Sequence, residues 1–359
     1  MSELKPSRDQ TILISMVRNE IGVIADFMAH ALALFDKICI ADHQSDDGTA
    51  EFLAELARTH PQVELWRFEE PGYYQSEVIN WMVNQVADPK RSDWIFLLDA
   101  DEFLPFATKE DFGRALTKFG SARFLRLPWL NLVPETFDRE SVLGRRLLRP
   151  PSTRPPCSIG KVAFRSSLRA VASFAIQMGN HLLEMDEKFP KRWMNMLPRR
   201  GQKMLRARYH TARTAFALYH IPIRNLDQLQ EKLQKGLHSL REKNNRAGWE
   251  CQHWDKIAQV VSAKGCSPEV ATGVILYYDQ PMESAREFSR ADLIAAGYEP
   301  MTLNVARESI SPLALQGAWQ RQNFTAGGRS FGISRYVTKS GSISPDRDRS
   351  RSSLAECAG

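Results

Sequence analysis

The stretch Trp94–Phe106, which reads WIFLLDADEFLPF, decides the fold. Its five apolar residues, Trp94–Leu98, lead directly into three carboxylates, Asp99, Asp101 and Glu102. A short apolar run of this composition is typical of a buried strand that is covered on both faces. Because an unpaired buried charge is costly, we expect the carboxylates at the mouth of a crevice, with a cation nearby.

Two of these carboxylates are placed to act together. Asp99 and Asp101 are two residues apart, so in an extended chain their side chains point to the same side. Both can then reach one divalent ion or its water shell, and oxygen ligands favour Mg²⁺ or Mn²⁺. The alternative is that the acidic residues only solvate a loop after the strand.

The composition is that of a globular protein. The 359 residues suffice for one large α/β domain with additions or for two domains, and the 43% hydrophobic fraction is ordinary. The net charge of +6 suggests anionic partners. Five scattered cysteines without a C-x-x-C pair predict reduced thiols in a cytoplasmic protein and no zinc site. The polar start is unlike a signal peptide, and no apolar run approaches the roughly 20 residues of a membrane span.

Strand-like and helix-like segments alternate over the first hundred residues. The strand-like segments are 11–17, 37–41, 63–68 and 94–98, and helical periodicity covers 21–35, 50–58 and 76–86. This alternation predicts βαβ units and a parallel sheet, in which ligands bind beyond the carboxyl ends of the strands. Asn19, Asp42 and Asp99 follow three of these strands, and their convergence favours a binding site over simple solvation.

The rest of the chain is less regular. A helix is predicted at 109–119 and a strand at 123–130, where Pro128 indicates an edge strand or a bulge. From 226 to about 297 the pattern is helical. From about Thr325 the chain is rich in Gly, Ser and Arg, which predicts a disordered tail.

Three motifs lie in order at the strand ends. They are R-N-E at 18–20, D-x-x-S-x-D-G-T at 42–49 and D-x-D-E-F at 99–103. With these motifs the chain resembles the catalytic half of family 2-like glycosyltransferases of the GT-A fold, in a bacterial branch. The likeness is clear over about 10–106 and weaker to about 236, where H-x-x-x-R at 220–224 and the following helix resemble the same branch.

The resemblance implies a fold and an activity. The implied fold is an α/β GT-A domain at 1–225, with a mixed, mainly parallel sheet flanked by helices. Its nucleotide-binding half spans about 10–106 and its acceptor half about 107–225, followed by a helical region at 226–324 and the tail at 325–359. The implied activity is inverting transfer of a sugar from a nucleotide diphosphate sugar to an acceptor hydroxyl, in bacterial surface polysaccharide or glycoconjugate synthesis. The implied cofactor is Mn²⁺ or Mg²⁺, which neutralises the diphosphate leaving group.

The resemblance also implies roles for residues of the three motifs. Asp42 is expected to contact the nucleobase, and Asn19 and Glu20 to line the nucleoside pocket. Asp99 is expected to hold the ribose and metal-bound water, and Asp101 to bind the metal directly.

Later residues extend the expected site. Lys161 lies in an I-G-K-V segment that resembles the same branch and is expected to meet the diphosphate, and Arg224 is expected near the nucleotide sugar. His220 ends a strand-like run, and in many GT-A enzymes a late histidine completes the metal shell. His181 is a second candidate. The alternative for both histidines is a structural role.

The acceptor base has three candidates. An inverting transfer needs a carboxylate within hydrogen-bond reach of the acceptor hydroxyl. Glu102 lies beside the expected metal site but could serve only to hold the loop, and Glu184 and Asp186 lie further along the chain. The acidic pair and the Gln-x-x-Arg-Trp motif of the processive members are missing from the sequence, which favours single addition over polymerisation.

A basic cluster suggests the acceptor. Residues 191–213 contain eight Lys or Arg and no acid, and Arg145, Arg146 and Arg149 precede them. The cluster predicts contact with a lipid-linked or other acidic acceptor, or peripheral contact with the inner face of the membrane; the alternative is a solvated basic face. Nucleic-acid binding is not expected, because no recognised fold or basic-aromatic platform accompanies the charge.

Two other classes stay open. A sugar nucleotidyltransferase would need a glycine-rich loop with a basic residue after the first strand, and 15–21 has none. A non-catalytic glycan- or nucleotide-binding protein on a GT-A scaffold would tolerate loss of the D-x-D pair, yet both aspartates are present.

Overall fold

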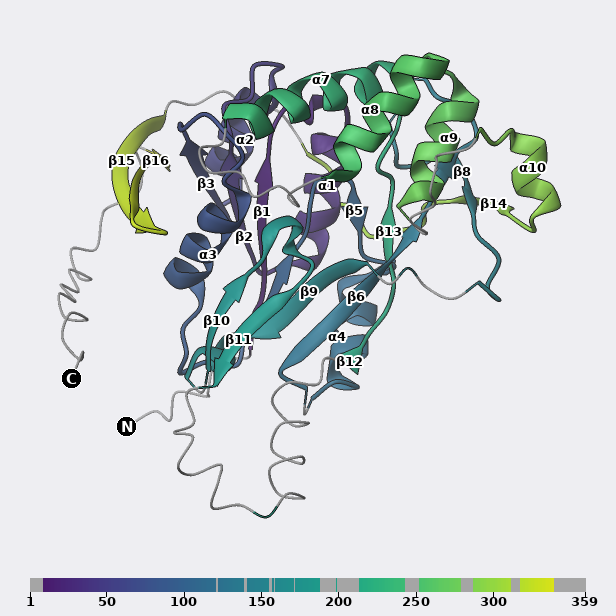
Figure 1. Ribbon diagram of the computed structural model, residues 1–359. Coiled ribbons are helices and arrows are strands. Elements are labelled where there is room, and N and C mark those ends of the chain that lie inside the picture. Colours follow the sequence, from purple (N-terminus) through teal and green to yellow (C-terminus); the bar gives the residue numbers. More distant parts are fainter. Residues whose placement is uncertain are drawn as a thin grey trace, which may run out of the picture.

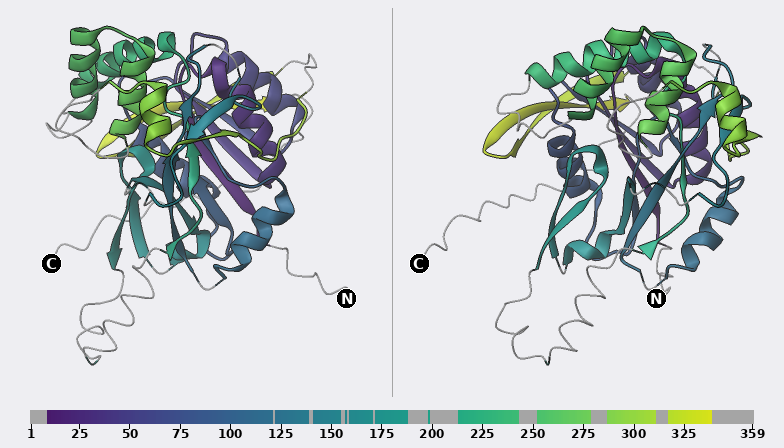
Figure 2. Two further views of the ribbon diagram at one scale, coloured as in Figure 1. Left: turned by 90° about the vertical axis from the view of Figure 1, so that its right-hand side faces the viewer. Right: turned by 45° about the vertical axis from the view of Figure 1, so that its right-hand side comes forward.

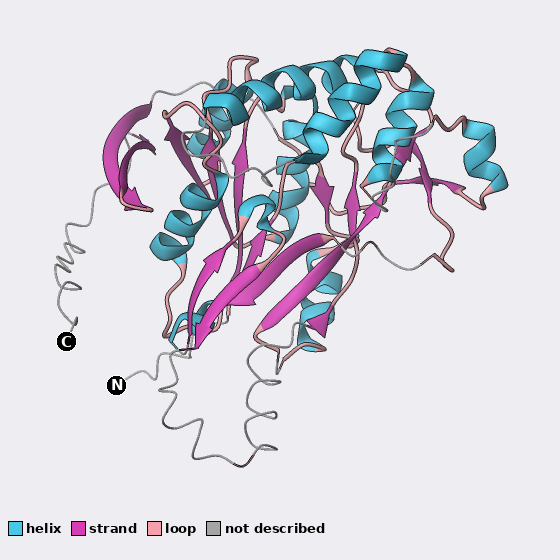
Figure 3. Cartoon of the chain, in the orientation of Figure 1, coloured by secondary structure: helices cyan, strands magenta, loops and turns pink. Residues whose placement is uncertain are grey.

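The computed structural model describes residues 9–120, 122–138, 141–154, 157, 159–170, 172–187, 198, 213–242, 252–278, 287–310 and 317–338. Within these residues one sheet of eleven strands runs through the molecule, with helices packed against it (Figure 1, Figure 3). Its order is β15-β16-β3-β2-β1-β4-β9-β6-β13-β5, with β12 beside β6. The predicted fold class, an α/β fold with a mixed sheet flanked by helices, is confirmed.

The centre of the sheet is parallel and alternates with helices as predicted. It consists of β1 (Thr11–Val17), α1 (Ile21–Leu34), β2 (Lys37–Asp42), α2 (Thr49–Thr59), β3 (Val63–Phe68), α3 (Gln75–Val86) and β4 (Trp94–Leu97). The order 3-2-1-4 is that of doubly wound nucleotide-binding sheets, and it reverses between β1 and β4. Ligands of such sheets bind beyond the carboxyl ends of the strands at this reversal.

The parallel strands bury both of their faces. On β1, Leu13 and Val17 join α1 and α2 in one core, whereas Ile12 and Ile14 join α3 in the other. This alternation follows from the two-residue period of a strand. Because both faces are covered, a central strand is apolar throughout, as in β4, where all four residues are buried.

Further elements follow β4 and widen the sheet. They are β5 (Glu102–Phe103), α4 (Lys109–Thr117), β6 (Phe124–Asn131), β9 (Gly160–Arg165), η1 (Ser166–Ala170), β10 (Ala172–Ile176), η2 (Met178–Asn180), β11 (Leu183–Glu187), β12 (Arg213–Thr214) and β13 (Leu218–His220). Strand β9 is antiparallel to both β4 and β6. Of the two alternatives for Pro128, an edge strand or a bulge, the edge strand is wrong, since β6 is an interior strand. The proline lies where the neighbouring strand is interrupted between β12 and β13, so the ladder is irregular at this point.

The C-terminal helices pack around a core of their own. They are α7 (Leu226–Glu242), α8 (Gln252–Lys264), α9 (Pro268–Tyr277) and α10 (Arg290–Ala295), joined by the short strands β7 (Val133–Pro134), β8 (Arg146–Arg149) and β14 (Glu299–Thr302). Figure 1 and both views of Figure 2 show these helices gathered at one end of the molecule. None of the described helices is long and apolar enough to cross a membrane.

A C-terminal hairpin corrects the predicted disordered tail. Strands β15 (Gly317–Ala326) and β16 (Arg329–Thr338) pair with each other, and β16 pairs with β3 at the sheet edge (Figure 1). Phe324, Phe331 and Ile333 are buried, and both phenylalanine rings lie against Phe68. In a strand a few alternating apolar residues suffice to cover a neighbour, and a prediction from composition misses that pattern. The part of the predicted tail after Thr338 lies outside the described residues.

Candidate functional site

A pocket of about 250 Å³ opens where the strand order reverses. It is lined by the ends of β1 and β4, by the loop before α3 and by one face of α7. The structure thereby brings together members of the first and third sequence motifs, Asn19, Glu20, Asp99 and Asp101, with His43 from the segment of the second. The carboxyl ends of strands at such a reversal are where α/β sheets bind ligands.

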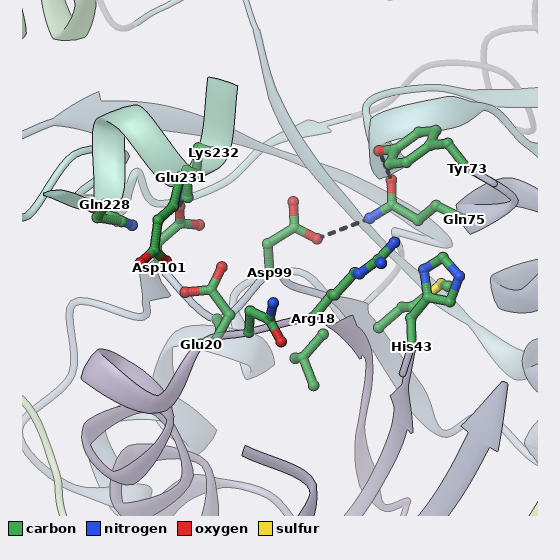
Figure 4. A pocket seen from close by; sticks show the side chains of 14 residues that line it. Arg18, Glu20, His43, Tyr73, Gln75, Asp99, Asp101, Gln228, Glu231 and Lys232 are labelled. Carbon is green, nitrogen blue, oxygen red and sulfur yellow. Dashed lines mark hydrogen bonds and ion pairs between the residues drawn. The ribbon is translucent and has the colours of Figure 1, made fainter. Parts of the chain in front are cut away.

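The pocket has two chemically different ends (Figure 4). The rings of His43 and Tyr73 lie at one end, which we call the aromatic end. Asp101 and Lys232 lie at the other, which we call the charged end. Asp99 lies between the two ends.

The loop after β1 is held by residues of the second motif. The backbone N–H of Asn19 donates to Ser45 Oγ at 2.9 Å, and the N–H of Glu20 donates to Thr49 Oγ1 at 2.9 Å. The N–H of Ile21 donates to a carboxylate oxygen of Asp47 at 3.0 Å. These bonds satisfy donors around the start of α1, which has no side-chain cap of its own. Asn19 adopts a left-handed conformation, φ 56°, which asparagine tolerates well.

Asp42 does not line the pocket. Its side chain is fully buried at the end of β2, where one carboxylate oxygen accepts from the N–H of Ser45 at 3.3 Å. Burial raises the pKa of Asp42. The neighbouring His43 lines the pocket instead and hydrogen-bonds the carbonyl of Glu70 at 2.9 Å. The predicted contact between Asp42 and a nucleobase stays a prediction.

Asp99 contacts a buried cluster, and we call the three residues Asp99, Lys161 and Glu102 the sealed cluster. Lys161 and Glu102 are fully buried, whereas Asp99 lines the pocket with 32% of its side chain exposed. Lys161 Nζ lies 2.5 Å from Asp99 Oδ2 and 3.6 Å from Glu102 Oε1, and it donates to the carbonyl of Gly179 at 2.7 Å. The Lys161 side chain is fully buried, so it does not reach the pocket directly. On the pocket side, Gln75 donates to Asp99 Oδ1 at 3.2 Å.

Glu102 holds the loop that carries the two aspartates. Its carboxylate accepts from the indole N–H of Trp129 at 2.6 Å and from the backbone N–H of Asp99 at 2.9 Å. The residue is fully buried, and that burial raises its pKa. A carboxylate so enclosed has no path to an acceptor hydroxyl, so the geometry favours its structural alternative over the role of base.

The charged end is built from a second set of residues, which we call the open cluster: Asp101, Lys232 and His220. Lys232 Nζ lies 2.9 Å from Asp101 Oδ2, and His220 Nε2 lies 3.9 Å from Asp101 Oδ1. Burial opposes the charge of Asp101, but the Lys232 ammonium holds the pKa of that carboxyl well below its usual range. Asp101 is therefore ionised at neutral pH.

His220 is neutral and oriented toward Asp101. Burial lowers its pKa to about 3. Its Nδ1 lies 2.5 Å from the amide oxygen of Asn131, and its ring stacks on Trp129 at 4.1 Å. With Asn131 as the acceptor, the ring proton is on Nδ1 and the lone pair of Nε2 faces the Asp101 carboxylate.

The predicted metal set is only partly assembled. The described residues contain no group of three or more His, Cys, Asp or Glu side chains placed to hold a metal ion. The Asp99 carboxylate is engaged by Lys161 and Gln75, whereas Asp101 Oδ1 and His220 Nε2 present two acceptors within reach of one ion. Mg²⁺ commonly binds one or two carboxylates together with water and substrate phosphates. The oxygen of Asp101 and the nitrogen of His220 therefore fit a divalent ion, although His220 does not itself line the pocket. The predicted contact between Asp99 and the metal or its water stays a prediction.

Other predicted residues lie around the pocket rather than in it. Arg224 is buried and donates to Glu20 at 2.9 Å, so it anchors a lining residue. His181 hydrogen-bonds the carbonyl of Gly160 at 2.8 Å and meets the ring of Trp129 edge-on, which indicates its structural alternative.

Some predictions concern parts of the chain that the structure leaves undescribed. Glu184 and Asp186 lie on β11, paired with β10, but their side chains are outside the described residues. The basic cluster at 191–213 lies almost wholly outside them. The arginines before it are ion-paired: Arg145 with Asp138, Arg146 with Glu135 and Arg149 with Glu299.

The contribution of α7 to the pocket was not predicted from the sequence. Gln228, Glu231 and Lys232 line it, although they lie about 130 residues after the D-x-D motif. Their spacing of three and four residues places them on one helix face, which in the sequence resembles an ordinary solvated face.

Comparisons with known proteins give distant neighbours only. No protein-family model and no curated protein matches the chain. Among solved structures, the mannosyltransferase PcManGT from Pyrobaculum calidifontis, in complex with GDP-Man and Mn²⁺, is 14% identical with a TM-score of 0.37, over 81% of this chain and 79% of that one. A putative glucose-1-phosphate thymidylyltransferase from Bacillus anthracis, in complex with a sucrose, is 9% identical with a TM-score of 0.33, over 67% of this chain and 98% of that one. Both TM-scores are below 0.5, so the geometry of the pocket itself carries the functional conclusion.

Proposed function

We propose that the protein is a glycosyltransferase that moves a sugar from a nucleotide diphosphate sugar to an acceptor hydroxyl. The observation that carries the proposal is the pocket at the β1–β4 reversal, which joins an aromatic end to a charged end. Nucleobases stack on aromatic rings, and diphosphates bind cations and metal ions. The three motifs that resemble GT-A glycosyltransferases all contribute to this pocket or its walls.

The proposed donor lies along the pocket in a defined direction. The base packs at the aromatic end against His43 and Tyr73, and the ribose hydroxyls donate to Asp99. The diphosphate then reaches the charged end at Asp101. A divalent ion held by Asp101 and His220 would neutralise the negative charge that grows on the departing diphosphate.

The acceptor side supports a further assignment. Glu231 of α7 is exposed and lines the charged end, where the sugar would lie, so we add it to Glu184 and Asp186 as a candidate for the base. In the transfer, the acceptor oxygen forms a bond to the anomeric carbon while the bond to the diphosphate breaks. The electron pair of that bond leaves with the diphosphate, and the acceptor proton passes to the base.

Calorimetric titration of GDP and UDP, with and without Mn²⁺, tests the proposal. We expect one diphosphate to bind at micromolar concentration and Mn²⁺ to strengthen it. Asp101→Asn should remove most of the Mn²⁺ effect, whereas Glu110→Gln, which changes an exposed carboxylate on α4, should leave it unchanged. A wild-type protein that binds neither GDP nor UDP in the presence of Mn²⁺ would overturn the proposed function.

A further inference from the structure

Helix α7 brings an accessible ammonium group to the charged end of the pocket. Lys232 Nζ lies 2.9 Å from Asp101 Oδ2 and donates to the carbonyl of Pro222 at 3.1 Å. These contacts account for two of its three N–H groups. Its side chain is 24% exposed. Lys232 is one of the residues that line the pocket (Figure 4). Lys232 is therefore fixed in position, with its third N–H left for a ligand.

A second donor from the same helix lies beside it. The side-chain oxygen of Gln228 accepts from the backbone N–H of Arg224 at 2.7 Å, which orients the amide. Its Nε2 is buried and has no hydrogen-bond partner among the described residues, although the side chain lines the pocket. A buried donor without a partner is costly unless a ligand supplies the acceptor.

The charges at this end limit where a diphosphate can bind. Asp101 and Lys232 form an ion pair at 2.9 Å, and the exposed Glu231 of α7 also lines this end. A diphosphate would add negative charge close to the Asp101 carboxylate, and such an approach is favourable only next to an ammonium or a metal ion. Lys232 contacts Oδ2 of Asp101, whereas the other oxygen faces His220, so the lysine and an ion at that oxygen do not compete for one atom.

We propose that Lys232, assisted by Gln228, binds the diphosphate of the donor nucleotide and neutralises part of its charge as it leaves. This inference rests on the proposed function and assigns the anion subsite within it. Lys232 keeps its proton throughout, because its role is electrostatic. A charge-assisted hydrogen bond of this kind should strengthen the affinity for the diphosphate roughly 10- to 100-fold.

The test compares diphosphates with the corresponding nucleosides. Affinities of GDP, UDP, guanosine and uridine are measured for the wild type, Lys232→Met, Lys232→Arg and the control Lys256→Met, which removes an exposed lysine of α8. Measurements without metal and with Mn²⁺ separate the lysine from the ion. We expect Lys232→Met to weaken diphosphate binding roughly 10- to 100-fold in both conditions and nucleoside binding less than twofold. Lys232→Arg should recover part of the loss, and Lys256→Met should match the wild type.

The outcomes separate this inference from the proposed function. If wild type binds a diphosphate and Lys232→Met binds it equally well, Lys232 is not part of the anion subsite and the proposed function stands. Equal losses for nucleoside and diphosphate in Lys232→Met would show that the lysine only shapes the pocket, which also overturns the inference. Thermal unfolding of each variant confirms that a loss of binding is not a loss of fold.

Discussion

The two clusters at the D-x-D motif contain the same pair of groups in opposite surroundings. In the sealed cluster, Lys161 is fully buried and meets Asp99 at 2.5 Å. In the open cluster, Lys232 is 24% exposed and meets Asp101 at 2.9 Å. Both pairs join a carboxylate to an ammonium, yet only the second ammonium is accessible from the pocket. Burial of the lysine, and not residue type, therefore separates the supporting pair from the pair that can bind a ligand.

The difference has a physical basis in the cost of an uncompensated charge. Lys161 lies between two carboxylates and a carbonyl, and one of the carboxylates, Glu102, is fully buried, so removal of Lys161 leaves a charge that water does not reach without its cation. Asp101 faces the pocket, so water or an ion can replace Lys232. The sealed cluster should therefore govern stability, and the open cluster should govern binding.

Lys161→Met should give the largest effect. It leaves the fully buried Glu102 without its cation, and breaking a buried ion pair in this way costs about 3–5 kcal/mol. The melting temperature should fall by roughly 10 °C. Lys232→Met is the matched control and should lower the free energy of unfolding by about 1 kcal/mol. Urea titrations of both variants measure the difference, and equal losses would mean that burial does not distinguish the clusters.

A smaller effect should come from His30, which hydrogen-bonds the backbone just after the sealed cluster. Its Nε2 accepts from the backbone N–H of Leu104 at 3.0 Å, and its Nδ1 donates to the carbonyl of Ala306 at 2.7 Å. Burial lowers its pKa from 6.5 to about 4. Between these values the unfolded chain binds a proton that the folded chain does not, so stability falls as the pH falls from 6.5 to 4.

The loss from His30 over that range is on the order of 3 kcal/mol. His30→Gln removes this titration, so its free energy of unfolding should decline less between pH 7 and pH 4.5 than that of the wild type. Urea unfolding at several pH values gives both curves. Parallel curves would show that His30 does not contribute to acid sensitivity.

The sequence predicted the parallel centre of the fold because its elements have strong local signals. Strands β1 to β4 are short apolar runs, and α1 to α3 have clear helical periods, so their order also located the reversal that forms the pocket. Asn19 and Asp99 could be placed there because both follow strands of that centre. Burial of Asp42 could not be predicted, since the loop after a strand can either expose or cover its last residue.

Long-range contacts explain what the sequence did not predict. Lys232 lies 131 residues from Asp101, and nothing in an amphipathic helix indicates which distant strand end its polar face meets. The predicted tail likewise contains part of the hairpin of β15 and β16. Its few apolar residues stabilise the hairpin only because the edge of β3 is available for pairing with β16. In both cases the role of the residue depends on the distant surface that it contacts, and the local sequence pattern contains no information about that surface.

The smallest effect should come from the aromatic end of the pocket, where the hairpin supports the loop before α3. Arg329 donates to the hydroxyl of Tyr74 and, at 3.3 Å, to Glu70, and its guanidinium lies 5.0 Å from the centre of the Tyr74 ring. The carbonyl of Glu70 in turn bonds His43. Arg329→Ala should loosen this end and weaken guanosine, uridine, GDP and UDP by the same two- to fivefold, since a half-exposed ion pair contributes at most about 1 kcal/mol. Lys232→Met should instead affect only the diphosphates, so the two variants give different patterns with the same four ligands.

Arg321→Ala, which changes an exposed arginine on β15, is the control and should change none of the affinities. If Arg329→Ala bound nucleosides as tightly as the wild type, the hairpin would only cover the edge of β3 and would not support the aromatic end. The two ends of the pocket would then differ in their structural support as well as in their chemistry.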